Sequence, residues 1–213
     1  LEPDLDFDCE GCEGVSKEEC EALVQIYKNL GGPDYDVYST SAWSDADGWW
    51  DSPGWLTTKD IDYWRGINTD RKGISTLNFH TIFGRPLIGD LSLVEWDKLK
   101  NLRHLDMSVH GSYGFNGEIP ESLTNLKLDT FYFNGHKMTI PNEKTLKWLY
   151  SIKDVQPDPS EVPLSESYEG KKPIQIPEID NVLVISGEVP DPVVIRLRQG
   201  VNIESDAVKI EVK

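Results

Sequence analysis

Three residues with the side chains of a hydrolytic triad alternate along the stretch HLDMS. They are His104, Asp106 and Ser108. Side chains two residues apart on a strand project in parallel, about 6.5–7 Å apart, which is too far for a relay of hydrogen bonds. The sequence also lacks a G-x-S-x-G elbow, an H-E-x-x-H motif and a glycine-rich phosphate loop. We therefore expect no enzyme activity and assign no catalytic residue.

A second cluster with possible chemistry is formed by the three cysteines, Cys9, Cys12 and Cys20. They could supply three of the four ligands of a zinc ion, but the nearest histidine is the distant His80. An odd number of cysteines allows at most one intrachain bridge. We favour a single disulfide that ties the N-terminal segment to a helix, and free thiols are the alternative. We expect no metal and no cofactor.

The segment SDADGWWD places three carboxylates, those of Asp45, Asp47 and Asp51, where a calcium loop could begin. The remainder of the D-x-[DN]-x-[DN]-G-x5-E pattern is missing. This segment is therefore predicted to be a polar turn rather than a metal site.

Five of the seven tryptophans lie in one loop-like stretch, at Trp43, Trp49, Trp50, Trp55 and Trp64. We interpret them as a core that covers one end of a repeat domain, because terminal repeats need such a covering. The alternative is a platform of exposed rings on which sugars stack. Exposure of the rings distinguishes the two interpretations.

Composition limits the possible partners. The 21 Lys and Arg residues against 37 Asp and Glu residues leave a net charge of −16, which disfavours nucleic acid and anionic membrane surfaces. No apolar run approaches the roughly 20 residues of a membrane helix. The chain begins at Leu1 rather than Met, which a removed export signal and a truncation explain equally well. The expected partner is a protein or an extracellular glycan, and the oligomeric state stays open.

The elements that would position these residues follow from two periodicities. Ser16 and Glu19 match a capping box that begins a helix, and Gly31 and Gly32 end it. Further along, three segments have apolar residues at positions one, four and six, at intervals of 28 and 26 residues. This period is typical of repeats in which a strand alternates with a looser helical return. The apolar positions are Ile74, Leu77, Phe79, Leu102, Leu105, Met107, Leu128, Phe131 and Phe133.

The stretch FNGEIPESLTNL, from Phe115 to Leu126, resembles the plant-type leucine-rich repeat, L-x-G-x-I-P-x-x-L-x-x-L. LIGDL and MTIP are degraded copies of it. CEALVQIYKNLGGPDY and YWRGINTD resemble the N-terminal cap of secreted bacterial members, but Asp62 and Thr69 stand where the family often has a cysteine pair. The resemblance covers about residues 18–150. It implies an α/β fold, namely a short leucine-rich repeat solenoid with a parallel concave sheet and an N-terminal helical cap. A C-terminal β appendage, outside the resemblance, is predicted from strand-like runs near the end of the chain.

In such a fold, side chains between the apolar strand positions point to solvent and form cross-strand rows. Exposed positions on this face usually contact the partner in the family, although polar residues at exposed positions prove only exposure. The predicted partner-binding residues, in three rows, are Thr76, His104 and Thr130; Asn78, Asp106 and Tyr132; and His80, Ser108 and Asn134.

The predicted organisation has five parts: an acidic, loose tail (1–15), the cap (16–73), the repeats (74–154), a Pro-rich linker or strap (155–177) and a β-rich segment (178–213). Seven of the thirteen prolines lie between Gln156 and Pro192. Three strand-like runs follow, NVLVISGEV, PVVIRLRQG and AVKIEVK, which would pack on the repeats, on each other, or begin a larger domain.

The predicted function is extracellular recognition. We expect a secreted or cell-surface protein, of bacterial type, that uses a leucine-rich repeat surface to bind a protein partner. The alternative is a glycan-binding accessory module that uses the Trp-rich cap loops.

Overall fold

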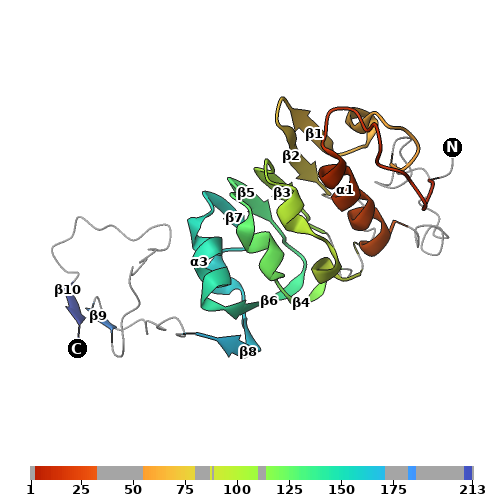
Figure 1. Cartoon of the computed structure of the whole chain (residues 1–213). Helices are drawn as coiled ribbons and strands as arrows, with labels where there is room; N and C mark the ends of the chain where they lie inside the picture. The colour runs from red at the N-terminus through yellow and green to blue at the C-terminus, as the bar shows by residue number, and fades with distance from the viewer. Residues whose placement is uncertain are drawn as a thin grey trace. The chain divides into compact units, whose positions relative to one another are not determined.

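The structure is a computed structural model that describes residues 3–32, 55–79, 87, 89–109 and 114–170, with the backbone of 182–185 and 209–212. The described part is a mixed α/β structure with parallel sheets and few helices (Figure 1). The chain divides into two compact units, Leu1–Tyr168 and Glu169–Lys213.

The larger unit contains a five-stranded sheet in the order β1-β2-β3-β5-β7. β1 and β2 form an antiparallel hairpin, and every later neighbour is parallel. A second sheet has the order β4-β6-β8. The strands are β1 (Ile67–Asp70), β2 (Gly73–Asn78), β3 (His104–Asp106), β4 (Asn116–Glu118), β5 (Thr130–Tyr132), β6 (Lys137–Asn142), β7 (Asp154–Gln156) and β8 (Leu164–Glu169).

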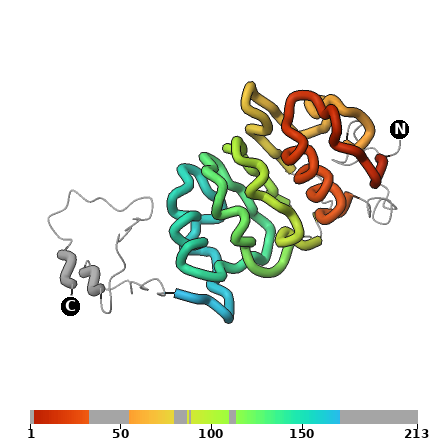
Figure 2. Tube along the Cα trace, in the orientation of Figure 1, coloured from red at the N-terminus to blue at the C-terminus, as the bar shows by residue number. Residues whose placement is uncertain are grey.

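Helical segments pack in a row beside the five-stranded sheet. α1 packs against the short 3-10 segments η3 and η4, η4 against η5, and η5 against α3 (Figures 1 and 2). Strand and helical return thus alternate along the chain, as the changing hydrophobic period predicts. The segments are α1 (Lys17–Asn29), η2 (Ile61–Tyr63), η3 (Leu91–Leu93), η4 (Trp96–Lys98), η5 (Glu121–Asn125), α3 (Glu143–Ser151) and η6 (Pro159–Glu161).

The core lies between these layers. All nine apolar residues of the predicted repeat pattern are buried, and they belong to one cluster with Leu123 and Leu126. The predicted burial of Leu105 and Phe131 in a common core is therefore confirmed.

The predicted first helix is also confirmed. Ser16 caps α1 and forms a capping box with Glu19. Beyond the last turn, Gly31 has φ of +100°, a conformation that costs glycine little. Glu19 does more than cap, because its second carboxylate oxygen accepts the backbone N–H of Ile74 at 3.1 Å. This buried carboxylate joins the start of α1 to the start of β2.

The N-terminal segment was expected to be loose, and this expectation is wrong for residues 3–15. Cys9 is buried, and the backbone N–H groups of Asp4 and Glu13 donate to the carbonyls of Leu56 and Lys59. The ring of Phe7 meets Trp64 edge to face. Acidic composition alone suggested disorder, but a few apolar side chains and a disulfide dock the segment.

Trp55 and Trp64 are fully buried, and their indole N–H groups donate to the carbonyls of Arg65 and Thr58. Their burial agrees with the interpretation as an end-covering core. Trp43, Trp49 and Trp50 lie outside the described residues, as do the carboxylates of the possible calcium loop, Asp45, Asp47 and Asp51.

The structure divides the C-terminal part differently from the sequence prediction. Residues 155–168, expected to begin a linker, carry most of β7, η6 and most of β8 and belong to the larger unit. In the smaller unit, β9 (Val182–Ile185) and β10 (Lys209–Val212) form a parallel pair. The first and third of the expected runs thus pair with each other, and the middle run lies outside the described residues.

Candidate recognition surface

The parallel registers bring the predicted surface residues together. Thr76 is paired with His104, and His104 with Thr130, which forms the first row. The second row joins Asn78, Asp106 and Tyr132 in the same way. The adjacency predicted for these six residues is confirmed.

The two rows lie on the face of the sheet that turns away from the core. Between them, Leu77, Leu105 and Phe131 point inward and are fully buried. His104 and Asn78 are exposed, and the other four row residues are half-buried. This alternation is what strand geometry requires when one sheet face packs and the other meets solvent.

β7 extends both rows by one residue that the sequence interpretation missed. Asp154 is paired with Thr130, and Gln156 with Tyr132. The signal was weak but present, since Ile152 and Val155 repeat the first and fourth apolar positions 24 residues after Leu128 and Phe131. Pro157 replaces the apolar residue at the sixth position and obscured the pattern.

Hydrogen bonds tie the rows across the strands. His104 Nδ1 lies 3.1 Å from Thr130 Oγ1. The Tyr132 hydroxyl donates to Asp154 Oδ2. This hydrogen bond, followed by partial burial and the charges of Asp154 and Asp106, raises the pKa of Tyr132. The phenol therefore stays protonated, and the two side chains hold each other in place.

The predicted third row is only partly realised. Ser108 was expected to face solvent, and this is wrong, because it is buried and its backbone N–H donates to Asp106 Oδ1 at 2.9 Å. The strand ends at Asp106, so the alternation that governs β3 no longer applies at Ser108. Asn134 donates to Gln156 Oε1 at 3.4 Å. His80 lies outside the described residues.

The same contacts bear on the triad-like spacing. His104 Nδ1 is turned towards Thr130 on the next strand, and Ser108 is buried. Asp106 contacts the backbone N–H of Ser108. None of these contacts joins the three side chains to one another.

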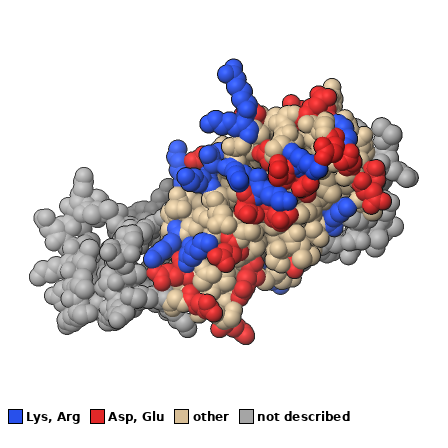
Figure 3. All heavy atoms as spheres, in the orientation of Figure 1, with Lys and Arg blue, Asp and Glu red and all other residues tan. Residues whose placement is uncertain are grey.

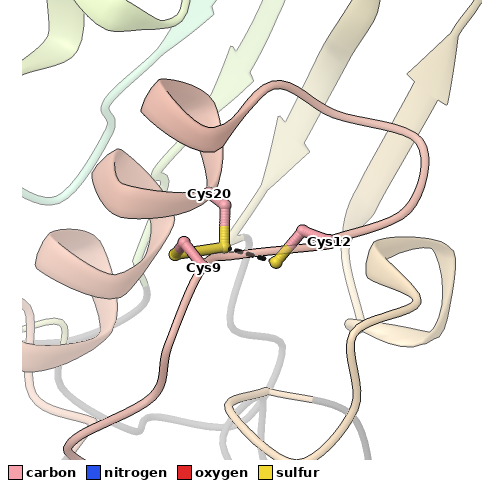
Figure 4. Close-up of side chains that lie close together, drawn as sticks. All are labelled: Cys9, Cys12 and Cys20. Carbon is pink, nitrogen blue, oxygen red and sulfur yellow. Dashed lines mark hydrogen bonds between the residues drawn. A yellow bond between two sulfur atoms is a disulfide. The ribbon is translucent and has the colours of Figure 1, made fainter.

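The cysteines form the other chemically distinct cluster of the described residues (Figure 4). Cys9 and Cys20 form a disulfide, which confirms the prediction of one bridge between the N-terminal segment and the helix. Cys12 is a free thiol whose Sγ lies 2.7 Å from that of Cys20. Burial raises the pKa of Cys12, opposed by the Lys59 ammonium and aided by Asp8.

All three sulfurs lie within 4.8 Å of one another, the arrangement that could hold a soft metal ion. However, a disulfide sulfur is not a thiolate ligand, so the oxidised cluster offers only the Cys12 thiol.

Among the described residues, no helix combines the length and apolar character needed to cross a membrane. Comparisons with family models, with curated proteins and with solved structures each find no match to this chain.

Proposed function

We propose that this chain is an extracellular recognition protein that binds a protein partner on the sheet face of a short leucine-rich repeat solenoid. One observation carries the proposal: eight polar side chains from four parallel strands stand in two in-register rows on one face. They are Thr76, His104, Thr130, Asp154, Asn78, Asp106, Tyr132 and Gln156.

The solenoid assignment is supported by the stacking of successive strand-and-return units, three of which bury apolar residues at positions one, four and six. The hairpin of β1 and β2, with α1 and the buried Trp55 and Trp64, would be its N-terminal cap. The Cys9–Cys20 disulfide supports an oxidising, secreted or cell-surface location.

Binding suits this face better than catalysis does. The row residues offer hydrogen-bond donors and acceptors of several kinds, and cross-strand contacts hold His104, Tyr132 and Asp154 in fixed positions. Pre-positioned polar side chains lose little entropy when a partner docks. Tyr132 is also of a residue type that often dominates interface energies.

The alternative glycan platform on the Trp-rich loops receives no support from Trp55 or Trp64, because both rings are buried. It would have to depend on Trp49 and Trp50.

The test is a differential capture experiment with extracellular proteins from the source organism. Three baits are compared: the full chain, a face variant and a control variant. The face variant carries His104→Ala, Asp106→Ala and Tyr132→Ala. The control variant carries Glu18→Ala, Asn125→Ala and Glu161→Ala, at three exposed residues away from the face. A partner retained by the parent and the control but lost by the face variant supports the proposal. Equal capture by all three baits contradicts it, and loss on changing Trp49 and Trp50 would move the site to the loops.

A further inference from the structure

A row of cationic side chains follows the edge of the sheet where the parallel strands begin. Each turn that precedes β2, β3, β5 or β7 carries at least one Lys or Arg side chain. We define the basic ridge as Arg71, Lys72, Lys100, Arg103, Lys127 and Lys153. Arg103 is half-buried and the other five are exposed. Figure 3 shows Lys and Arg gathered along the upper edge of the molecule in this view, in a chain whose net charge is −16.

Within the described ranges of the chain, the ridge cations are not neutralised by ion pairs. The salt bridges of the described residues use Lys17, Lys59, Lys98, Lys144 and Lys147. No ridge side chain joins an ion pair among the described residues. Three carboxylates lie beside ridge cations, those of Asp70, Asp129 and Asp154. Asp70 Oδ1 accepts the backbone N–H of Lys72, and the Tyr132 hydroxyl donates to Asp154 Oδ2. An excess of positive charge therefore remains at this edge.

Hydrogen bonds hold the ridge turns against one another. The Asn101 side chain donates to the carbonyl of Lys72, and Arg103 Nη1 donates to the carbonyl of Lys127 at 2.9 Å. The backbone N–H of Asp129 donates to the Arg103 carbonyl at 2.8 Å. Since neighbouring strands lie about 4.8 Å apart, the cations form one continuous line across the sheet.

We infer that the basic ridge binds an anionic polysaccharide, one that carries carboxylate or sulfate groups along a chain of hydroxyl-bearing sugars. The inference goes beyond the proposed protein binding, because it concerns the charged edge that borders the sheet face and a different class of ligand. The cations would meet the anionic groups. The residues immediately inside the ridge on β2, β3 and β5 are Thr76, His104 and Thr130, whose hydroxyl and imidazole groups suit sugar hydroxyls.

Charge density favours a polysaccharide over nucleic acid. Duplex DNA carries one charge per about 1.7 Å of axis, and its length would face the repulsion of the acidic remainder of the chain. A polysaccharide of lower charge density is repelled less. Screening over about 8 Å at physiological salt confines the attraction to the ridge itself. An acidic peptide matches the cations but lacks the hydroxyl groups.

The test compares two triple variants of the full chain with the same net charge. The ridge variant is Lys100→Gln, Lys127→Gln and Lys153→Gln. The control is Lys28→Gln, Arg65→Gln and Lys137→Gln, which removes three exposed cations that lie outside the ridge and form no ion pair among the described residues. Binding is measured by calorimetry at about 50 mM salt. The probes are polygalacturonate for carboxylates, heparin for sulfates, neutral dextran, polyglutamate and single-stranded DNA.

The expected result is that at least one anionic polysaccharide binds the parent and the control equally, and binds the ridge variant about tenfold or more weakly, with a smaller dependence on salt. Comparison of the affinities for heparin and for polygalacturonate then shows whether the ridge prefers sulfate or carboxylate groups. Lack of binding to both polysaccharides, an equal loss in the control, or equally tight binding of polyglutamate or DNA overturns the inference. The ridge variant should still capture the protein partner of the sheet face, so failure of one proposal leaves the other measurable.

Discussion

At the scale of single residues, His136 has both ring nitrogens committed. Nδ1 accepts the backbone N–H of Phe115 at 2.7 Å, so Nε2 is the protonated nitrogen and donates to the carbonyl of Met107 at 2.6 Å. The ring also stacks on Phe115, with centroids 4.8 Å apart. Burial lowers the pKa of His136, opposed by the hydrogen bond to Met107. The folded protein therefore needs the neutral imidazole.

This requirement predicts a loss of stability in acid. Because the folded-state pKa of His136 lies below the unfolded value of about 6.5, its contribution is complete above pH about 6.5 and is lost as the pH falls through the folded pKa. In His136→Asn, the amide oxygen can accept the Phe115 N–H at any pH, so the free energy of unfolding should fall less between pH 7.5 and 5.5. Urea unfolding measures this, and the exposed His104→Asn is the control. Parallel pH profiles for parent and His136→Asn would contradict the assignment.

A second residue-scale prediction compares two glycines in the left-handed region. Gly73 has φ of +122°, and a Cβ there would clash with Glu19 Oε1. Gly117 has φ of +110°, and a Cβ would meet nothing within 4 Å. Alanine at either site costs about 1–2 kcal/mol of backbone strain. Gly73→Ala should cost about 1–3 kcal/mol more by crowding the buried carboxylate. Equal unfolding free energies for the two variants would show that the Glu19 side chain can move aside at little energetic cost.

At the scale of elements, one sulfur anchors the N-terminal segment to α1. Cys20 holds the disulfide with Cys9, and the Cys12 thiol lies 2.7 Å away on the same segment. Thiolate attack by Cys12 on Cys20 would replace one bridge by the other without an oxidant, because Cys9 leaves as the new thiolate. Either bridge joins the same two elements.

Cysteine variants should therefore differ in their response to reductant. In the parent, a bridge with a sequence separation of 11 contributes about 3 kcal/mol to the free energy of unfolding. Cys9→Ala should keep most of that reductant-sensitive stability, because Cys12 can pair with Cys20, and Cys12→Ala should keep it all. Cys20→Ala should lose it. Chemical unfolding with and without reductant measures the difference, and a Cys9→Ala protein insensitive to reductant would show that the second pairing does not form.

At the scale of the larger unit, one hydrophobic cluster runs from Cys9 to Val162. Leu105 lies near its middle, between Leu77 and Phe131 on the flanking strands, and is fully buried. Such a continuous core predicts cooperative unfolding rather than independent unfolding of separate strand-and-return units.

Leu105→Ala should lower the free energy of unfolding by about 2–5 kcal/mol through lost transfer energy and the cavity left behind. The neighbouring His104→Ala, exposed on the same strand, should change it by less than about 0.5 kcal/mol. Tryptophan fluorescence and far-ultraviolet circular dichroism should report a single shared transition. An unchanged melting temperature for Leu105→Ala would contradict the register of β3.

Many of the buried residues and of the exposed strand residues could be predicted from local sequence patterns. The apolar residues at positions one, four and six of each unit predicted which side chains would be buried and which would share a row. Ser16 and Glu19 predicted the start of α1. These features depend on residues a few positions apart, whose relative directions are set by strand and helix geometry. The proposed binding rows on β2, β3 and β5 were therefore accessible from the sequence.

Other features depend on contacts that the local hydrophobic pattern does not specify, and only the tertiary structure decided them. Glu19 reaches Ile74, β7 adds Asp154 and Gln156 to the rows, and Ser108 turns inward where its strand ends. Three cysteines on one short segment permit several pairings, and distance in the folded chain selects Cys9 with Cys20. The basic ridge could not be predicted from the sequence either, because its cations are spread from Arg71 to Lys153 and become neighbours only when parallel strands pair side by side.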